Sequence, residues 1–201
     1  MAGCRVEAMF SVSARVRPVA RALSLALLLA GGAVGAPAAR PASGSLAWPA
    51  GHGLVDQTGA VLDEARFAGR LRLVYFGYTR CPDLCPTALM TVTQALDELP
   101  PALLARLVPV LVAADPERDG PAALARYLDT FHPAIVAVTG PVAVIDALAA
   151  AVAAPIRRHD GVVDHPGDLF LVGPAGDVLA RLPNGIDPDA LAATLRAALA
   201  R

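Results

Sequence analysis

An apolar strand passes into a helix within Tyr75–Pro86, which reads YFGYTRCPDLCP and places Cys81 and Cys85 at the junction. The unpaired N–H groups and aligned peptide dipoles at a helix N-terminus favour a thiolate over a thiol. They can bring the pKa of a cysteine from about 8.5 down to roughly 3.5–7.5. The thiolate is the form that binds soft metals and attacks disulfides. We therefore expect the Cys81–Cys85 pair to carry redox or metal chemistry.

A structural disulfide is the alternative for this pair. In the chain-entropy model, closing a loop of about five residues is worth only about 2 kcal/mol, against about 4.7 kcal/mol for a hundred-residue loop. Cys81 and Cys85 are neighbours along the chain, so a disulfide between them would stabilise the fold only a little. The remaining cysteine, Cys4, lies in a predicted targeting segment.

Strands and helices alternate along the chain on both sides of the junction. A turn signal between Val55 and Val61 predicts an N-terminal β-hairpin. Apolar runs predict strands at 71–76, 107–113, 135–138, 169–172 and 178–182, and helical spacing and caps predict helices at 86–99, from 119, at 141–154 and from 187. This order predicts an α/β fold with a central mixed sheet and helices on both faces, and it resembles the thioredoxin fold.

Composition limits the classes of function. The 201 residues carry a formal net charge of −1, so the chain lacks the excess of positive charge that is typical of proteins that bind nucleic acid. Hydrophobic residues make up 55% of the chain but aromatic residues only 4%, which indicates a core of small aliphatic side chains. The length fits one domain of ordinary size behind a leader.

The N-terminus reads as an export signal. Arginines precede the uncharged run Ala22–Ala39, whose length is borderline for a membrane span. A cleaved signal peptide and a retained membrane anchor are therefore both open, and in either case the domain would be periplasmic or outward-facing on the inner membrane. We predict three parts: residues 1–36 as signal or anchor, 37–50 as a flexible linker, and 51–201 as a thioredoxin-like domain.

Two sulfur ligands leave a soft metal under-coordinated, which directs attention to the histidines. His165 stands in the stretch VVDHPGDLFLVGP, in the loop that enters the penultimate strand. In a thioredoxin fold this loop faces the active cysteines, so we expect His165 to be functional. His52, near the start of the domain, and His132, before a proline, are expected to have structural roles.

Three motifs together resemble the Sco/SenC family. They are CPDLCP after YFGYT, the DPERD segment at Asp115–Asp119, and VDH at Val163–His165 shortly before LVGP. They occur in the order and spacing of that family, and the resemblance extends from about Gly53 to the C-terminus. Members of the family are thioredoxin-like, copper-binding proteins required to assemble the binuclear copper centre of cytochrome c oxidase.

The resemblance implies a ligand set and partners. By the motif match, Cys81, Cys85 and His165 would bind one copper ion, and the two cysteines would also form a redox pair. Two thiolates and an imidazole suit Cu(I), and the imidazole keeps Cu(II) accessible. The implied partners are the copper-site subunit of cytochrome c oxidase and other copper chaperones.

Three aspartates near these motifs have alternative roles. Asp164 would either orient His165 as a hydrogen-bond partner or be a solvated loop carboxylate. Asp115 and Asp119 could be ligands of a hard metal, but a strand-end turn and a helix N-cap explain them better.

Two features depart from the family pattern. Pro166 follows the histidine, where a small or hydroxyl residue is usual, and it restricts His165 toward extended geometry. The segment Arg157–Val163 is also shorter than is common. Copper affinity could therefore differ from the family norm, and His159 is an alternative ligand.

Two functions remain open from the sequence. The first is a copper chaperone that delivers metal to the oxidase subunit and is not an enzyme. The second is a thiol–disulfide reductase that keeps the target cysteines of that subunit reduced, which does not obviously need His165. A peroxidase of the peroxiredoxin type fits less well, because the chain has no Pro-x-x-x-Thr-x-x-Cys segment.

Overall fold

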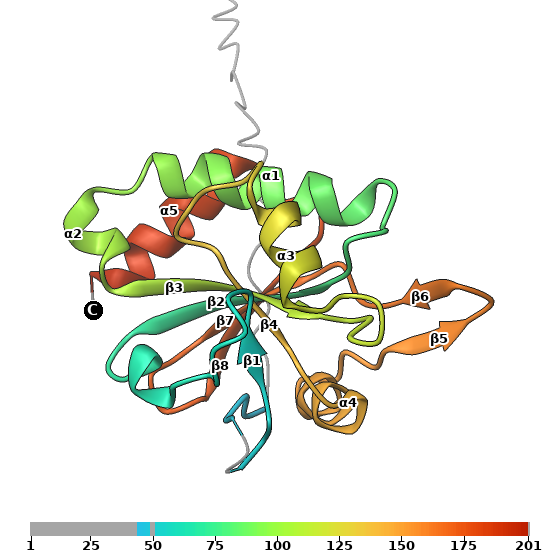
Figure 1. Ribbon diagram of the computed structural model, residues 1–201. Helices are drawn as coiled ribbons and strands as arrows, with labels where there is room; N and C mark the ends of the chain where they lie inside the picture. Colours follow the sequence, from blue (N-terminus) through green and yellow to red (C-terminus); the bar gives the residue numbers. More distant parts are fainter. Residues whose placement is uncertain (1–43, 49–50, 201) are drawn as a thin grey trace, which may run out of the picture. The chain divides into compact units, whose positions relative to one another are not determined.

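A six-stranded mixed sheet forms the centre of the fold in the computed structural model, which describes residues 44–48 and 51–200 (Figure 1). Its strands are β1 (Val55–Asp56), β2 (Leu71–Gly77), β3 (Leu107–Ala113), β4 (Val136–Thr139), β7 (Leu169–Val172) and β8 (Val178–Leu182). Their order across the sheet is β1-β4-β3-β2-β7-β8. The central strands β2, β3 and β4 are parallel, and β1, β7 and β8 run antiparallel to their neighbours.

Helices cover both faces of this sheet, as Figure 1 shows. One face carries α1 (Leu84–Asp97), α3 (Pro121–Leu128) and α5 (Pro188–Leu199). The other face carries α4 (Val142–Ala151) and the 3-10 helix η1 (Glu64–Phe67). The short helix α2 (Pro101–Leu104) leads into β3. Side chains alternate along a strand, so β2 sends Leu73 and Tyr75 into one core and Val74 and Phe76 into the other. The predicted thioredoxin-like α/β fold is confirmed.

The predicted N-terminal segment of residues 1–36 lies outside the described residues. Within residues 44–48 and 51–200, none of the helices combines the length and the apolar character that a membrane crossing requires.

Helix α1 begins earlier than the sequence predicts. Pro86 was expected to be its first regular residue, but the helix starts at Leu84, which places Cys85 and Pro86 inside the first turn. The first backbone hydrogen bond of the helix runs from Thr87 N–H to Asp83 O. Because the N–H groups before Thr87 have no partner within the helix, a proline in this turn removes no helical hydrogen bond.

The predicted N-terminal hairpin is present but short, with hydrogen bonds from Leu62 N–H to Leu54 O and from Asp56 N–H to Ala60 O, each at 2.9 Å. Val55 forms a single bridge with Val61, and the Asp56 carboxylate accepts hydrogen bonds from the N–H and the hydroxyl of Thr58 inside the turn. The main pairing of β1 is instead with the sheet, where Val55 lies opposite Thr139 of β4.

A second hairpin was not predicted. It consists of β5 (Arg157–His159) and β6 (Val162–Asp164), which pair antiparallel and project from the body of the domain in Figure 1. Its two turn residues both have positive φ, 48° at Asp160 and 78° at Gly161. Asp-Gly with both residues at positive φ is the preferred two-residue hairpin turn, so this dipeptide was the overlooked signal.

The predicted linker of residues 37–50 extends too far. Leu46 is completely buried in the core, and Ser45 forms an isolated bridge with Asp177. The buried Arg72 guanidinium donates to Leu46 O at 2.9 Å and fixes this segment to β2. Gly44–Trp48 is therefore part of the packed domain, and residues 37–43 lie outside the described part of the chain.

Candidate metal centre

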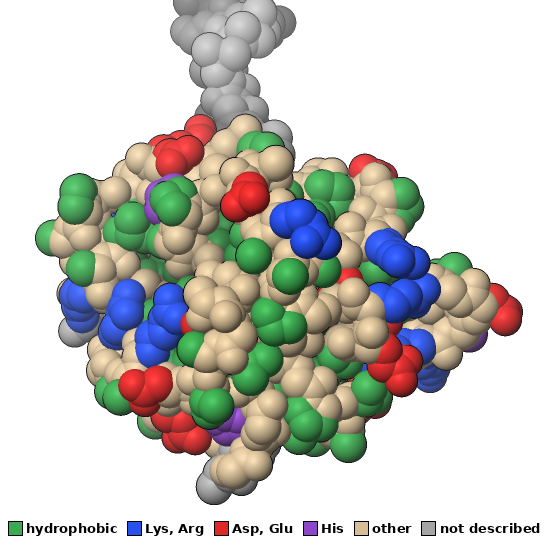
Figure 2. All heavy atoms as spheres, viewed as in Figure 1, with side chains coloured by type: hydrophobic (Ala, Val, Ile, Leu, Met, Phe, Trp, Pro, Cys, Tyr) green, Lys and Arg blue, Asp and Glu red, His purple; other side chains and the backbone are tan. Residues whose placement is uncertain are grey.

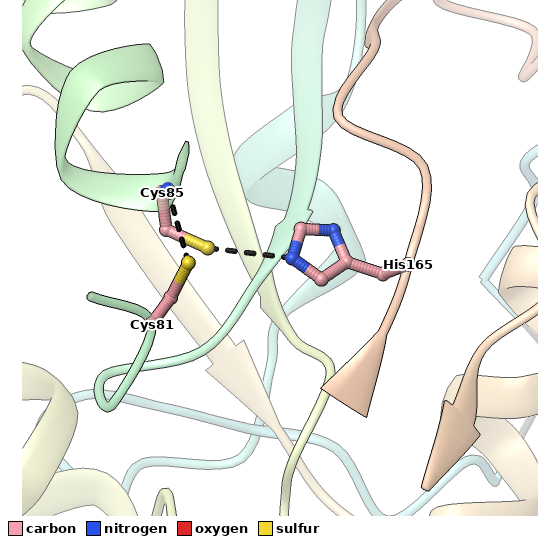
Figure 3. A group of neighbouring side chains, drawn as sticks. All are labelled: Cys81, Cys85 and His165. Atoms are coloured by element: carbon pink, nitrogen blue, oxygen red, sulfur yellow. Dashed lines mark hydrogen bonds between the residues drawn. The ribbon is translucent and has the colours of Figure 1, made fainter. Parts of the chain in front are cut away.

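Cys81, Cys85 and His165 converge at the carboxyl end of β2, as Figure 3 shows. The chain turns directly after the strand, with a hydrogen bond from Cys81 N–H to Tyr78 O. This turn presents Cys81, and the first turn of α1 presents Cys85. His165 comes from the connection between β6 and β7, which faces the two cysteines. The carboxyl edge of parallel strands is where open α/β sheets place their ligand sites.

The three potential ligand atoms lie within 4.8 Å of one another. Cys85 Sγ is 3.4 Å from His165 Nε2. The N–H of Cys85, one of the helix donors without a helical partner, donates to Cys81 Sγ at 3.3 Å. Cys81 and Cys85 are both free thiols. The sulfur of Cys81 therefore accepts a hydrogen bond from the first turn of the helix that carries Cys85. This bond holds the Cys81 sulfur beside the start of that helix.

Burial controls the protonation of Cys85. The side chain is fully buried, and desolvation raises the pKa of the Cys85 thiol to about 12. This direction is opposite to the one predicted from the helix N-terminus, and desolvation is its largest cause. Cys81 is only half-buried and lies nearer the solvent.

The imidazole of His165 is held in one tautomer. Its Nδ1 lies 3.0 Å from Pro166 O, and since a carbonyl only accepts, Nδ1 carries the proton. Burial lowers the pKa of His165, which favours the neutral ring. Nε2 then presents a lone pair toward Cys85 Sγ. The rings of Tyr75 and Tyr78 stand edge-on to the imidazole, with centroids at 5.9 Å and 5.7 Å.

The expected partner of His165 is different in the structure. Asp164 does not bond to His165 but to His159, with 2.8 Å between Asp164 Oδ2 and His159 Nε2. His159 is exposed and lies outside the ligand cluster, so it does not act as an alternative ligand in this conformation. The Pro166 carbonyl takes the orienting role, and because it is a backbone group, any residue at this position could supply it.

His52 and His132 have the structural roles predicted for them. His52 Nδ1 accepts the N–H of Leu54 at 2.8 Å, and His132 Nδ1 accepts the N–H of Ala134 at 3.0 Å. Both rings thus fix the backbone two residues further along, and neither belongs to the cluster.

The two aspartates of the DPERD segment lie outside the cluster of Cys81, Cys85 and His165, and one of them has another role than expected. Asp115 pairs with Arg118 in the turn after β3. Asp119 does not cap α3, whose N-cap is Gly120. Its buried carboxylate instead accepts hydrogen bonds from the N–H and the hydroxyl of Thr79, on the loop before Cys81. This link crosses two loops far apart in sequence, so no local pattern indicates it.

The donor set fits a soft, thiophilic metal. Thiolates prefer Cu(I), Zn and Fe, and imidazole accommodates Cu in both common oxidation states. A neutral imidazole with its lone pair toward the two sulfurs needs no change of tautomer to bind a metal. Cysteine binds a metal as the thiolate, so Cys85, whose pKa is raised by burial, must lose its proton on binding.

Comparison with known proteins identifies the family. The model of the SCO1/SenC family matches residues 46–200. The chain belongs to the SCO1/SenC family. It is 33% identical over 143 residues to a "Putative copper-binding protein" of Stutzerimonas stutzeri, a match that covers 69% of this chain and 70% of that protein. It is also 35% identical over 133 residues to the human "Protein SCO1 homolog, mitochondrial", with 63% of this chain and 44% of that protein covered.

Other SCO1/SenC relatives match over a shorter stretch. A SCO2-like protein of Rickettsia conorii is 41% identical over 87 residues, which cover 43% of this chain and 42% of that protein. Among solved structures, Arabidopsis thaliana ScoI with copper bound superposes with a TM-score of 0.65 at 25% identity, covering 81% of this chain and 99% of that one. Bradyrhizobium japonicum ScoI with copper bound gives 0.61 at 26% identity, with 80% and 99% covered.

Proposed function

We propose that this SCO1/SenC protein is a copper chaperone that holds one copper ion through Cys81, Cys85 and His165 and delivers it to the binuclear copper centre of cytochrome c oxidase. The observation that carries the proposal is the convergence of the two sulfurs and the imidazole nitrogen within 4.8 Å. The similarity to solved Sco proteins with copper bound supports copper as the metal.

The protein side of the binding reaction follows from the site. Copper replaces the protons of Cys81 and Cys85, and the Pro166 carbonyl keeps the proton of His165 on the nitrogen that faces away from the metal. Tyr75 and Tyr78 line the imidazole with their rings and limit the access of water to it. Cys81 and His165 are partly exposed and Cys85 is buried, so the ligands of a receiving protein would approach from the side of Cys81 and His165.

Metal analysis of purified variants tests the ligand set. We expect one copper per chain in the natural protein, and loss of Cu(I) binding in Cys81→Ser and Cys85→Ser, because one thiolate and one imidazole make a poor Cu(I) site. His165→Ala should weaken binding, and His159→Ala, which removes the neighbouring exposed imidazole, is the matched control and should bind as the natural protein does. Full stoichiometric copper in Cys85→Ser would refute the assignment.

A thiol–disulfide reductase is the second candidate function. It is favoured by the close pair of free thiols, of which Cys81 is accessible and Cys85 is buried. A structural relative is described as a Sco family member with a disulfide switch. His165→Ala separates the two functions, since a reductase would keep its activity on a disulfide-linked oxidase peptide, whereas a chaperone would lose copper transfer to it.

The proposed delivery partner is the copper-site subunit of cytochrome c oxidase, with other copper chaperones as donors of the metal. One structural relative is described as a member of the Sco family of cytochrome c oxidase assembly proteins. We also propose that the domain faces outward from the inner membrane, behind residues 1–36. A reporter that is active only outside the cytoplasm, fused after residue 50, should give signal, and a reporter active only inside should not.

A further inference from the structure

One turn of the chain forms contacts with both loops that carry the ligand residues, although it supplies no ligand residue itself. This is the β3–α3 turn, residues Ala114–Gly120, which contains the DPERD motif. Its aspartates do not belong to the ligand cluster. The turn lies between the loop that precedes Cys81 and the β5–β6 hairpin that precedes His165, and it forms hydrogen bonds to both.

On the cysteine side, the contact is made by Asp119. The side chain is completely buried, and its two oxygens accept two hydrogen bonds from one residue, Thr79. Oδ2 is 2.9 Å from Thr79 N, and Oδ1 is 2.6 Å from Thr79 Oγ1. Because both the backbone and the side chain of Thr79 are fixed, the start of the turn that presents Cys81 has a defined position relative to β3.

On the histidine side, the contacts are made by arginines. Arg118, which pairs with Asp115, donates through both terminal nitrogens to Gly161 O at 3.3 Å. In the opposite direction, Arg158 of β5 donates from Nε to Ala114 O at 2.8 Å. Figure 2 shows arginine and acidic side chains gathered where the hairpin joins the body of the domain. The hairpin is therefore tied to the same turn as the Cys81 loop.

We propose that the β3–α3 turn is a positioning element that sets the separation of Cys81 and His165. Asp119 acts through Thr79 on the cysteine, and Arg118 acts through the hairpin on the histidine. The inference rests on the proposed copper function, since it explains how that site keeps its geometry. A site whose supporting contacts are loose by about 1 Å loses function, and removal of such outer contacts typically costs 10–100-fold in metal affinity.

The contact on the cysteine side, between Asp119 and Thr79, is tested with Asp119→Ala and Asp119→Asn. Alanine leaves both Thr79 donors without acceptors, so we expect the Cu(I) affinity to fall about tenfold. Asparagine accepts from Thr79 N–H and donates to its hydroxyl, and should restore affinity to within about twofold. In a glutathione buffer without copper, Asp119→Ala should shift the Cys81–Cys85 equilibrium toward the dithiol by about threefold, because the two sulfurs are held together less firmly. Thr79→Val removes the hydroxyl donor and leaves the buried Asp119 side chain in place. It should reproduce part of the loss of Cu(I) affinity and part of the shift toward the dithiol.

The contact on the histidine side, between Arg118 and the hairpin, is tested with Arg118→Ala in the natural protein and in the His165→Ala variant. In the natural protein we expect copper affinity to fall about tenfold while the dithiol–disulfide equilibrium stays unchanged. In a His165→Ala background the same change should have no further effect on affinity, because the ligand on which Arg118 acts is gone. Arg196→Ala, which breaks an exposed ion pair with Glu98 at the other end of α1, is the control and should alter neither measurement.

Several results would overturn the inference. An undiminished effect of Arg118→Ala in the His165→Ala background would mean that Arg118 acts on general stability. If both Asp119→Ala and Thr79→Val bind Cu(I) with the affinity of the natural protein, Asp119 does not position Cys81 through Thr79. If the natural protein binds no copper, the proposed function fails, and the glutathione equilibrium of the Asp119 and Thr79 variants still decides whether the turn positions Cys81.

Discussion

The two cysteines differ in environment although they stand four residues apart. Cys85 points into the core and keeps its proton, because burial raises the pKa of its thiol to about 12. Cys81 is half-buried and accepts the N–H of Cys85. The sequence indicated the pair and its place at a strand-to-helix junction, although the helix begins two residues earlier than predicted. The strength of desolvation at Cys85 depends on how the whole core closes over it. Local sequence therefore predicted which residues act and not their protonation.

Copper affinity should rise with pH across the neutral range. Binding displaces the proton of Cys85, so below a pKa of about 12 each pH unit should raise the apparent affinity about tenfold from this thiol alone. His165 adds no such dependence at neutral pH, because burial lowers its pKa and the ring is already neutral. Competition with a Cu(I) chelator between pH 6 and 9 measures the slope. A flat profile would contradict the buried, protonated Cys85.

Most strands of the sheet were predictable because they are largely apolar, whereas β1, with only Val55 and Asp56, carries no apolar run. Strands β3, β7 and β8 have the predicted bounds. The β5–β6 hairpin was missed because its strands, RRH and VVD, have three residues each and are too short to show an apolar run or an alternation. Its stability comes from the Asp-Gly turn and from ties to the β3–α3 turn. Tertiary contacts of this kind leave no periodic pattern in the sequence.

Gly161→Ala should disturb the metal site through the hairpin. Gly161 has φ of 78°, so an alanine there costs about 1 kcal/mol in strain and displaces the hairpin that leads to His165. Gly59→Ala is the matched control, since Gly59 has φ of 84° and, like Gly161, has no backbone close to an added Cβ. Urea unfolding should show a similar loss of stability in both variants, and copper titration should show weaker binding only in Gly161→Ala. Equal copper affinities would mean that the hairpin does not support His165.

At the scale of the whole molecule, the sequence predicted the fold class, the family and the three residues that the structure brings together. It did not predict where the packed domain begins. Composition marked residues 37–50 as a linker, yet Leu46 is buried and Arg72 donates to its carbonyl. Gly and Ser content describes the flexibility of an isolated segment, and here burial of a single large side chain outweighs it.

Leu46→Ala should therefore destabilise the domain. Deletion of a fully buried leucine typically costs about 2–5 kcal/mol, through lost burial and the cavity left behind. Leu179→Ala is the matched control, because Leu179 on β8 is 45% exposed and its loss should cost about 0.5 kcal/mol or less. Urea denaturation of both variants gives the comparison. If Leu46→Ala is as stable as Leu179→Ala, Gly44–Trp48 does not belong to the folded unit.

X-ray absorption spectroscopy of the copper-loaded protein tests the central claim most directly, because it counts the ligands by type. The account predicts two sulfur ligands and one imidazole nitrogen, with the nitrogen signal lost in His165→Ala and retained in His159→Ala. A natural protein whose copper has no imidazole ligand, or whose spectrum is unchanged by His165→Ala, would contradict the assignment of Cys81, Cys85 and His165 as the copper site.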